Sequence, residues 1–427
     1  MSTVISASVP AAAPTAAGVL RAALNPDATV RFEPFGAVAY VGHRDDFFAV
    51  DAAHADLLRR LHVGPAALTG ADRARAAALA ALGVCVTDPP TAPRPNQARS
   101  LVGRLVDLPA LDRPLLVNCF STAHCPLRCV YCHADDLMIP YREGEQWSDV
   151  AAVTRTAALV PALVAVVTGG DPIVAPARAA FLIRRLAVHK RVVLDTSGAG
   201  DIRPLLPELR RASAHVRVSV DSDRREVHDR VRPVSPRYLP RGSSSFDAAH
   251  GTLRTLLDAG VPCSVQTVVG RHNEEPDALR RLRDDLLARG VRYWVLHAAV
   301  PAGKAERHRG VLPGPDVLDH LRAFVAECAA AGLPLDIRVT GTAAAPNSVL
   351  LIDSRGRLCV QRADGPGKRV VWPADARPDV AALRRLLDAH IDWAGHAGRY
   401  LNGPLAPARA RPPALPAPAP GVGAARR

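Results

Sequence analysis

Several kinds of residue are scarce in this chain of 427 residues. Aromatic residues make up only 4%, whereas hydrophobic residues reach 48%, so the core must consist mainly of alanine, valine and leucine. Lysine occurs only as Lys190, Lys304 and Lys368, and the formal net charge of +13 therefore comes from arginines that alternate with acids, as in LRRLRDDLLARG. Because no polybasic run carries interleaved aromatics, we do not expect a nucleic-acid partner.

Long hydrophobic runs are also missing. No uninterrupted apolar segment reaches the roughly 18–20 residues that cross a bilayer. The first residues, MSTVISASVPAAAPTAAGVL, lack a basic start, and Pro10 and Pro14 interrupt any apolar centre, so they do not resemble a signal peptide. The eight cysteines are clustered, which argues against a disulfide framework. These features predict a protein of the reducing cytoplasm without a membrane segment.

Composition divides the chain into a small N-terminal module and a large α/β domain. Residues 1–27 are rich in alanine and proline and are expected to be disordered. Residues 28–88 contain the strand-like runs VRFEPFGAVAYV and DFFAVD, followed by helical periodicity in 52–62 and 70–84, which predicts a small α+β, winged-helix-like domain. Prolines mark residues 89–112 as a linker.

Residues 113–332 alternate strand and helix. Six near-continuous apolar runs are each followed by a segment of helical periodicity: PLLVNC, LVAVVTGG, RVVLDTSG, HVRVSVDS, VPCSVQTVVG and VRYWVLHAAVP. Such runs are typical of parallel strands that are buried on both faces. A complete barrel has eight β/α units, so six predict a partial (β/α)6 TIM-like barrel with its functional residues at the carboxyl ends of the strands.

The remaining residues, 333–403, are expected to form a short α/β extension. The runs PLDIRVT, NSVLLIDSRGRLCV and RVVW predict strands, IDSRG predicts a hairpin turn, and 379–391 predicts a helix. Residues 404–427 are rich in proline and alanine and are expected to be a disordered tail.

The most informative stretch follows the first strand of the barrel and reads NCFSTAHCPLRCVYCHADDLM. Cys125, Cys129 and Cys132 are spaced C-x3-C-x2-C, so three thiolates can turn inward from one tight loop. Sulfur ligands suit zinc or an iron–sulfur cluster. A closed zinc site needs a fourth ligand, for which Cys119 or His133 is available. Three cysteines alone favour a cluster with one metal corner left open.

The three cysteines, with Tyr131 just before the third, resemble the signature of the radical S-adenosylmethionine (radical SAM) enzymes. A partial barrel of six units is known for that family. The resemblance implies that Cys125, Cys129 and Cys132 bind three irons of a [4Fe-4S] cluster, and that the fourth iron binds S-adenosylmethionine. It also implies reductive cleavage of this cofactor to methionine and a 5′-deoxyadenosyl radical, which removes a hydrogen atom from the substrate.

The ends of the next strands resemble the family's cofactor-binding motifs. The segment TGGDP resembles its Gly-Gly-Glu-Pro motif, in which glycine lets the methionine amine approach closely, although aspartate replaces the commoner glutamate. DTSG resembles the Thr-Asn-Gly turn, and SVD resembles the Ser-x-Asp pair that faces the ribose and the methionine carboxylate. The cofactor-binding residues implied by the resemblance are Tyr131, Gly169, Gly170, Asp171, Pro172, Ser197, Ser219, Asp221 and Arg232.

Further positions correspond to the family less closely. His228, Asp229 and Arg232 lie in REVHDRVR, which resembles a His-Asp-x-x-Arg run whose arginine meets the methionine carboxylate. Gln266 and Asn273 also correspond to family positions. Alternation along the sixth strand leaves open which of its side chains face adenine or the substrate. The candidates there are Tyr293, Trp294 and His297.

The N-terminal module resembles the PqqD-like domains that bind leader peptides in maturases of ribosomally synthesised peptides (RiPPs). Such a domain offers a strand edge to an extended peptide; the alternative is a structural cap. The leading hypothesis is a radical SAM enzyme that crosslinks, epimerises or oxidises a precursor peptide, with flavodoxin or ferredoxin as electron donor. The alternatives are a radical SAM dehydrogenase or similar enzyme that acts on a small molecule, and a non-enzymatic zinc-binding protein.

Cysteines outside the trio are expected mainly in the core, and the extension has too few of them for auxiliary clusters. Cys119 is interpreted as a core residue, with a ligand or redox role as the alternative. Cys359 is the one candidate catalytic residue, as a hydrogen-atom donor of the kind that epimerases of the family need; the alternative is a half-buried small hydrophobe. Cys85, Cys263 and Cys328 carry no functional prediction.

Overall fold

The protein is described from a computed structural model that covers residues 4–6, 21–68, 70–88, 90, 111–139, 144–340, 346–362 and 367–401. The expected tail and nearly all of the expected linker lie outside these residues. Two short strands, β1 (Val4–Ser6) and β2 (Arg21–Leu24), lie within the N-terminal stretch for which no structure was expected. Both are held by pairing with strands that follow later in the chain, a contact that local composition does not reveal.

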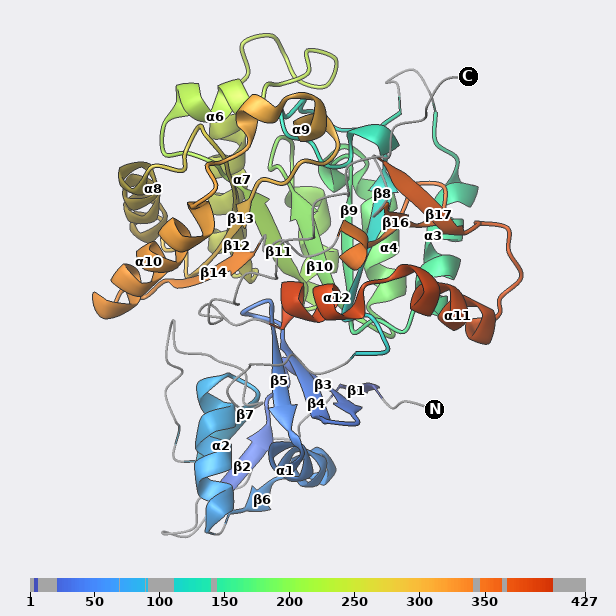
Figure 1. The fold of residues 1–427 in the computed structure, drawn as a ribbon, viewed down its shortest axis with the longest axis vertical. Helices are drawn as coiled ribbons and strands as arrows, with labels where there is room; N and C mark the ends of the chain where they lie inside the picture. The colour runs from blue at the N-terminus through green and yellow to red at the C-terminus, as the bar shows by residue number, and fades with distance from the viewer. Residues whose placement is uncertain are drawn as a thin grey trace, which may run out of the picture.

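A parallel sheet forms the large domain and confirms the partial barrel (Figure 1). Its strands pair in chain order, with one or more helices between successive strands. Six of these strands match the six predicted runs, and a seventh, from PLDIRVT, extends the barrel beyond the sixth. The parallel strands are β8 (Leu116–Thr122), β9 (Val164–Gly169), β10 (Arg191–Thr196), β11 (His215–Ser219), β12 (Cys263–Val269), β13 (Tyr293–Ala298) and β14 (Asp336–Thr340).

Helices cover the outer face of this sheet because their apolar residues recur at helical spacing. In α4, for example, Ala179, Leu182 and Ile183 are buried against the strands. Together with outward-facing strand residues such as Val117, they form the largest core cluster. The helices of this domain are α3 (Trp147–Leu159), α4 (Pro176–Leu186), α5 (Leu206–Arg211), α6 (Arg225–Val231), α7 (Ser245–Asp258), α8 (Pro276–Ala288), α9 (Lys304–Arg307) and α10 (Val317–Ala330).

The C-terminal extension adds to the other edge of the same sheet. β15 (Leu350–Ile352) pairs in parallel with β8, and β16 (Leu358–Gln361) and β17 (Lys368–Trp372) continue the sheet in antiparallel pairing. The predicted hairpin turn is confirmed, since Gly356 adopts a positive φ of 87° between β15 and β16. Two helices follow, α11 (Val380–His390) and α12 (Trp393–Tyr400).

The N-terminal module combines two small antiparallel sheets with two helices, and Figure 1 shows it in blue beneath the barrel. One sheet has the strand order β1-β3-β4-β5, and the other has the order β6-β2-β7. The new elements are β3 (Ala28–Glu33), β4 (Gly36–Val41), β5 (Asp46–Asp51), α1 (Ala52–Val63), β6 (Ala66–Ala67), α2 (Ala71–Ala81) and β7 (Cys85–Asp88).

The β4–β5 hairpin closes the barrel at the amino ends of its strands. Tyr40 and Phe47 of this hairpin share a core cluster with Leu116 and Val164, the first residues of β8 and β9. The turn of the hairpin places the buried Asp45 against Arg217 of β11, at 2.5 Å from Nε and 3.0 Å from Nη2. The module therefore packs against the end of the barrel at which the strands begin.

None of the helices in the described residue ranges is long and apolar enough to cross a membrane.

Candidate functional site

The cysteine loop leaves the carboxyl end of β8 and is fixed by backbone bonds on both sides. The N–H of Arg128 donates to the carbonyl of Pro233 at 2.8 Å, and that of Val130 donates to Val231 at 3.0 Å. The carboxylate of Glu145 accepts from the N–H of Ala123 at 2.8 Å and thereby holds the start of the loop. The loop is thus preorganised before any metal binds.

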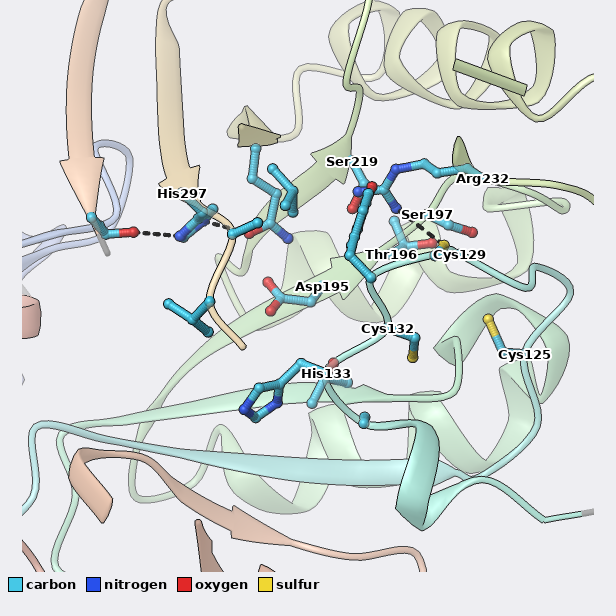
Figure 2. Close-up of a pocket in the computed structure, with 18 of the residues that line it drawn as sticks. Cys125, Cys129, Cys132, His133, Asp195, Thr196, Ser197, Ser219, Arg232 and His297 are labelled. Atoms are coloured by element: carbon cyan, nitrogen blue, oxygen red, sulfur yellow. Dashed lines mark hydrogen bonds between the residues drawn. The ribbon is translucent and has the colours of Figure 1, made fainter. Parts of the chain in front are cut away.

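The three cysteines of the trio line one cavity of about 370 Å³ (Figure 2). Burial raises the pKa of Cys129 to about 11, although the guanidinium of Arg232, whose Nη1 lies 3.9 Å from Sγ, opposes this. Burial also raises the pKa of Cys125 and Cys132 above the usual range. Buried thiols become thiolates when a metal cation compensates the charge, so these cysteines are suited to metal ligation.

The glycine pair at the end of β9 lets this strand meet the cysteine loop. The N–H of Gly170 donates to the carbonyl of Thr122 at 2.8 Å, and that of Asp171 donates to His124 at 2.8 Å. A Cβ on Gly170 would lie 1.9 Å from the carbonyl oxygen of His124, and Gly169 has a φ of 137°. Glycine is therefore required at 170 by the close approach of two backbones and at 169 by its dihedral angle.

Replacing Gly170 by alanine is expected to lower the free energy of unfolding by about 1–3 kcal/mol, because the new methyl group forces the cysteine loop away from β9. Urea denaturation measures this change. Gly251→Ala on α7 is the matched control: its Cβ meets nothing within 4 Å, and the substitution should stabilise the helix by about 0.5–1 kcal/mol. Equal stability of Gly170→Ala and the wild type would contradict the packing argument.

Asp171, Pro172 and Asp221 do not line the cavity. The buried carboxylate of Asp171 accepts from the N–H of Ser197 and the hydroxyl of Thr196, both at 2.8 Å, and so ties the end of β9 to the end of β10. It holds Ser197, which does line the cavity, in place.

Asp221 has a similar role behind the cavity wall. It accepts from Arg232 Nε at 2.7 Å, from the N–H of Val268 at 2.9 Å and from the Tyr131 hydroxyl. Burial alone would raise the pKa of Asp221, but the Arg232 guanidinium outweighs it and lowers the pKa to about 2. The carboxylate therefore orients Tyr131 and Arg232, which, with Ser219, line the cavity.

Three residues whose motif match was weaker stabilise the elements around the cavity and do not line it. His228 is fully buried in α6, and its Nδ1 lies 3.2 Å from the Ser245 hydroxyl. Asp229 accepts from the N–H of Phe246 at 2.9 Å and fixes the start of α7. Asn273 donates to the carbonyl of Asp221 at 2.8 Å. These contacts place none of the three in the cavity wall.

Two residues of the sixth strand of the barrel, His297 and Ala298, line the cavity. His297 lines it together with Gln266, whose Oε1 lies 3.2 Å from the imidazole Nε2. Trp294 points the other way, into the core, where it packs on Phe324. Tyr293 faces inward at the base of the barrel, near His43 of the N-terminal module.

The other cysteines lie outside the cavity. Cys119 is fully buried in the core between sheet and helices, and burial raises the pKa of this thiol to about 12. Cys359 is 1% exposed and packs behind Phe120 and Leu351, so it does not reach the cavity surface. The remaining buried cysteines are Cys85, Cys263 and Cys328.

A second cavity of about 680 Å³ adjoins the first and lies inside the barrel. Among the side chains that line both cavities is Asp195, which Figure 2 shows pointing into the pocket. Sequence motifs did not indicate Arg217, Arg338 or Arg399, which also line this second cavity. A signal existed for the first two, because a charged residue at an alternate position of an apolar strand indicates a polar barrel interior.

The geometry defines a class of protein: a partial parallel barrel in which a cysteine loop and neighbouring strand ends enclose one pocket. A sequence model of the Radical SAM superfamily matches residues 120–286, which include the trio and the ends of β9, β10, β11 and β12. The chain therefore contains a radical SAM domain, and the recognition of this family from the motifs is confirmed.

Curated relatives match the same part of the chain. The PqqA peptide cyclase of Xanthomonas campestris pv. campestris is 26% identical over 163 residues, which are 38% of this chain and 41% of the cyclase. The AdoMet-dependent heme synthase of Methanosarcina barkeri is 29% identical over 208 residues, 47% of this chain and 55% of the synthase. The chain thus covers less than two thirds of the length of these relatives.

Solved structures show the same fold. Streptococcus suis SuiB bound to the precursor peptide SuiA has a TM-score of 0.54 at 12% identity and covers 85% of this chain and 88% of its own. The structure of anSMEcpe with bound AdoMet has a TM-score of 0.51 at 15% identity and covers 66% of this chain and 83% of its own.

Proposed function

We propose that the protein is a radical SAM enzyme that removes a hydrogen atom from a ribosomally synthesised precursor peptide. The observation that carries this proposal is the shared cavity: Cys125, Cys129 and Cys132 line it together with residues from the ends of β9, β10 and β11. A cofactor held there meets both the thiols and the polar strand ends.

The three thiols suit a [4Fe-4S] cluster better than a single zinc ion. Among the residues that the structure describes, no group of three or more His, Cys, Asp or Glu side chains is placed to hold one metal ion. Two sulfurs on one tetrahedral zinc, each about 2.3 Å from the metal, would be only about 3.8 Å apart. Sulfurs that bind separate irons of a cluster lie further apart than this. Three cysteines that line one cavity but are not placed to bind the same ion therefore fit a cluster better than zinc.

The polar wall beside the thiols suits S-adenosylmethionine. Arg232 offers a guanidinium for the methionine carboxylate, Ser197 and Ser219 offer hydroxyls, and Gly170 leaves the wall without a side chain. When bound, the cluster supplies the electron that cleaves this cofactor. Asp221 holds Arg232 in place from behind, and this preorganisation positions the cofactor without further ordering of side chains.

A peptide substrate is supported by the relatives, since a PqqA peptide cyclase matches the radical SAM domain and SuiB is known with its precursor peptide. We propose that the N-terminal module is PqqD-like and takes part in peptide binding. Strand β1 pairs with the outer edge of β3, so a peptide that adds to this edge has to displace β1. A flavodoxin or ferredoxin as electron donor and a reducing cytoplasm complete the proposal. None of the eight cysteines forms a disulfide, which is compatible with such a compartment.

Anaerobic reconstitution with iron and sulfide tests the radical chemistry. We expect a brown protein with about four irons per chain that forms 5′-deoxyadenosine from S-adenosylmethionine only when dithionite is added. Iron analysis and mass spectrometry of the nucleoside are the measurements. A colourless protein with one stoichiometric zinc would instead establish the zinc-binding alternative.

The substrate class is tested with the full chain. Synthetic peptides that correspond to short open reading frames beside the gene should increase 5′-deoxyadenosine formation and lose hydrogen or gain a crosslink by mass spectrometry. Stimulation by a filtered small-molecule extract, with none by the peptides, would favour the small-molecule alternative.

A further inference from the structure

The second cavity is a chamber that adjoins the cofactor pocket and is not lined by any of the three cysteines. Phe47 of the β4–β5 hairpin contributes to its wall, and Phe120, Leu351 and Tyr400 supply further apolar surface. At about 680 Å³ it has room for one or two amino-acid side chains with their backbone. Because it shares Asp195 and His297 with the cofactor pocket, a group bound in the chamber lies next to the cofactor.

Two arginines of the chamber already have carboxylate partners. Arg217 is paired with Asp45 of the hairpin, and its Nη1 lies 3.3 Å from Asp195. Arg338 is paired with Asp46 at 3.0 Å. The N-terminal hairpin therefore neutralises the base of the chamber and leaves these arginines with less attraction for a ligand.

Arg399 differs from these two arginines. It projects from α12, and its Nε donates to the Ser348 hydroxyl at 3.0 Å, which fixes the direction of the guanidinium. Among the residues that the structure describes, Arg399 has no carboxylate partner, and it lines both cavities. An oriented guanidinium without a counter-charge in a cavity wall is a site for a planar anion.

A second polar group of the chamber also has no partner. Gln361 of β16 is 8% exposed and lines the chamber, and its Oε1 accepts no hydrogen bond within the described part of the protein. Buried amide oxygens are normally satisfied, so this one calls for a donor from a ligand. A peptide N–H is such a donor.

Four arginines and the two carboxylates of Asp195 and Glu306 line the chamber, and Asp45 and Asp46 pair with two of these arginines. Burial lowers the pKa of His297 to about 3, and the charges of Arg338, Arg217 and Arg399 add to this effect. His297 is therefore neutral at ordinary pH and does not supply the missing counter-charge. Because none of these carboxylates pairs with Arg399 in the described part of the protein, this guanidinium favours a ligand that brings a negative group of its own.

We propose that Arg399 binds a carboxylate of the substrate peptide, and that Gln361 accepts an N–H from the same peptide. This inference rests on the proposed function and specifies it: the modified segment contains an acidic residue or a free C-terminus beside the reacting carbon. The methionine carboxylate of the cofactor is a different source of the same chemistry. Arg232, whose Nη1 lies 3.9 Å from Cys129 Sγ, is closer to the thiols, where that group is expected, although Asp221 already compensates its charge.

Binding of short peptides tests the proposal without turnover. Ac-Ala-Glu-Ala-NH2, its glutamine isostere and the glutamine peptide with a free C-terminus are titrated by saturation-transfer NMR against the reconstituted full chain with S-adenosylmethionine. At least one acidic peptide should bind about tenfold or more tightly than the neutral one, as one charge-assisted contact implies. Arg399→Gln should abolish this preference, Arg399→Lys should retain part of it, and the exposed control Arg384→Gln should leave it unchanged.

The two acidic peptides distinguish a side-chain carboxylate from a C-terminal one, and selectivity for either supports the proposal. Absence of selectivity in the wild type, or selectivity that survives in Arg399→Gln, would overturn it. A loss of S-adenosylmethionine affinity in Arg399→Gln without a change in peptide selectivity would assign the arginine to the cofactor and also overturn it. Failure to form 5′-deoxyadenosine would count against the proposed function. The peptide-binding selectivity and its dependence on Arg399 test the further inference independently of that result.

Discussion

Replacing Cys129 by alanine is expected to remove the iron-dependent colour and to lower 5′-deoxyadenosine formation by more than about 100-fold. Loss of an outer-shell partner already costs up to about 100-fold in metal sites, and a direct ligand should cost more. Cys129 is also the cysteine whose Sγ accepts from Arg232, so the substitution removes a thiolate and leaves a buried guanidinium facing a void. Iron content and anaerobic product formation are the measurements.

Cys119→Ala is the matched control for this experiment. Cys119 lies in the middle of β8, the strand that leads into the cysteine loop, but its side chain points into the core, so iron content should stay at the wild-type level. If Cys129→Ala kept full iron and activity, the trio would not be the metal site. If Cys119→Ala lost iron while folded, Cys119 would have to be reconsidered as a ligand.

Replacing Asp45 by asparagine is expected to lower the free energy of unfolding by about 3–5 kcal/mol, because it leaves Arg217 buried without its main counter-charge. Asparagine tolerates the positive φ of 51° at this position, so the backbone is not the cause of any loss. Burial alone would raise the pKa of Asp45, but Arg217 outweighs it and holds the pKa well below the usual range. Urea denaturation with tryptophan fluorescence measures the change.

The pH dependence gives this prediction a second readout. A carboxylate with a lowered pKa adds stability that is present above the unfolded value of about 3.9 and is lost as the pH falls through the folded pKa. The difference between wild type and Asp45→Asn should therefore be constant from about pH 5 to pH 8 and shrink below about pH 4.

Asp201→Asn is the control, because Asp201 pairs with Arg203 at the surface, where ion pairs contribute little. It should leave the unfolding midpoint unchanged. An Asp45→Asn protein as stable as the wild type would show that the hairpin is held by its apolar contacts alone.

The sequence determined the strand order, the parallel sheet and the loop that carries the three predicted metal ligands. Buried parallel strands give apolar runs that can be recognised without neighbours, and three cysteines within eight positions must share one loop. The glycine pair at the end of β9 was also predictable, since only glycine permits so close a backbone approach.

Other features depended on the tertiary structure. Asp171 and Asp221 match cofactor-binding motifs, yet their carboxylates lie behind the cavity wall and hold Ser197 and Arg232 in place. A motif gives the position of a residue along the chain, but the direction of its side chain depends on which buried donors surround it.

The chamber was the part that sequence patterns could not define. Arg399 follows Cys129 by 270 positions and comes from a helix with no motif, and Asp45 belongs to a different module. Charges so far apart in the chain meet only after the hairpin and the C-terminal helix have packed against the barrel. The sequence by itself therefore indicated the class of cofactor chemistry for which the strand ends are suited. The tertiary structure decided which charged side chains remain available to the substrate, because only packing determines which of them form ion pairs with each other.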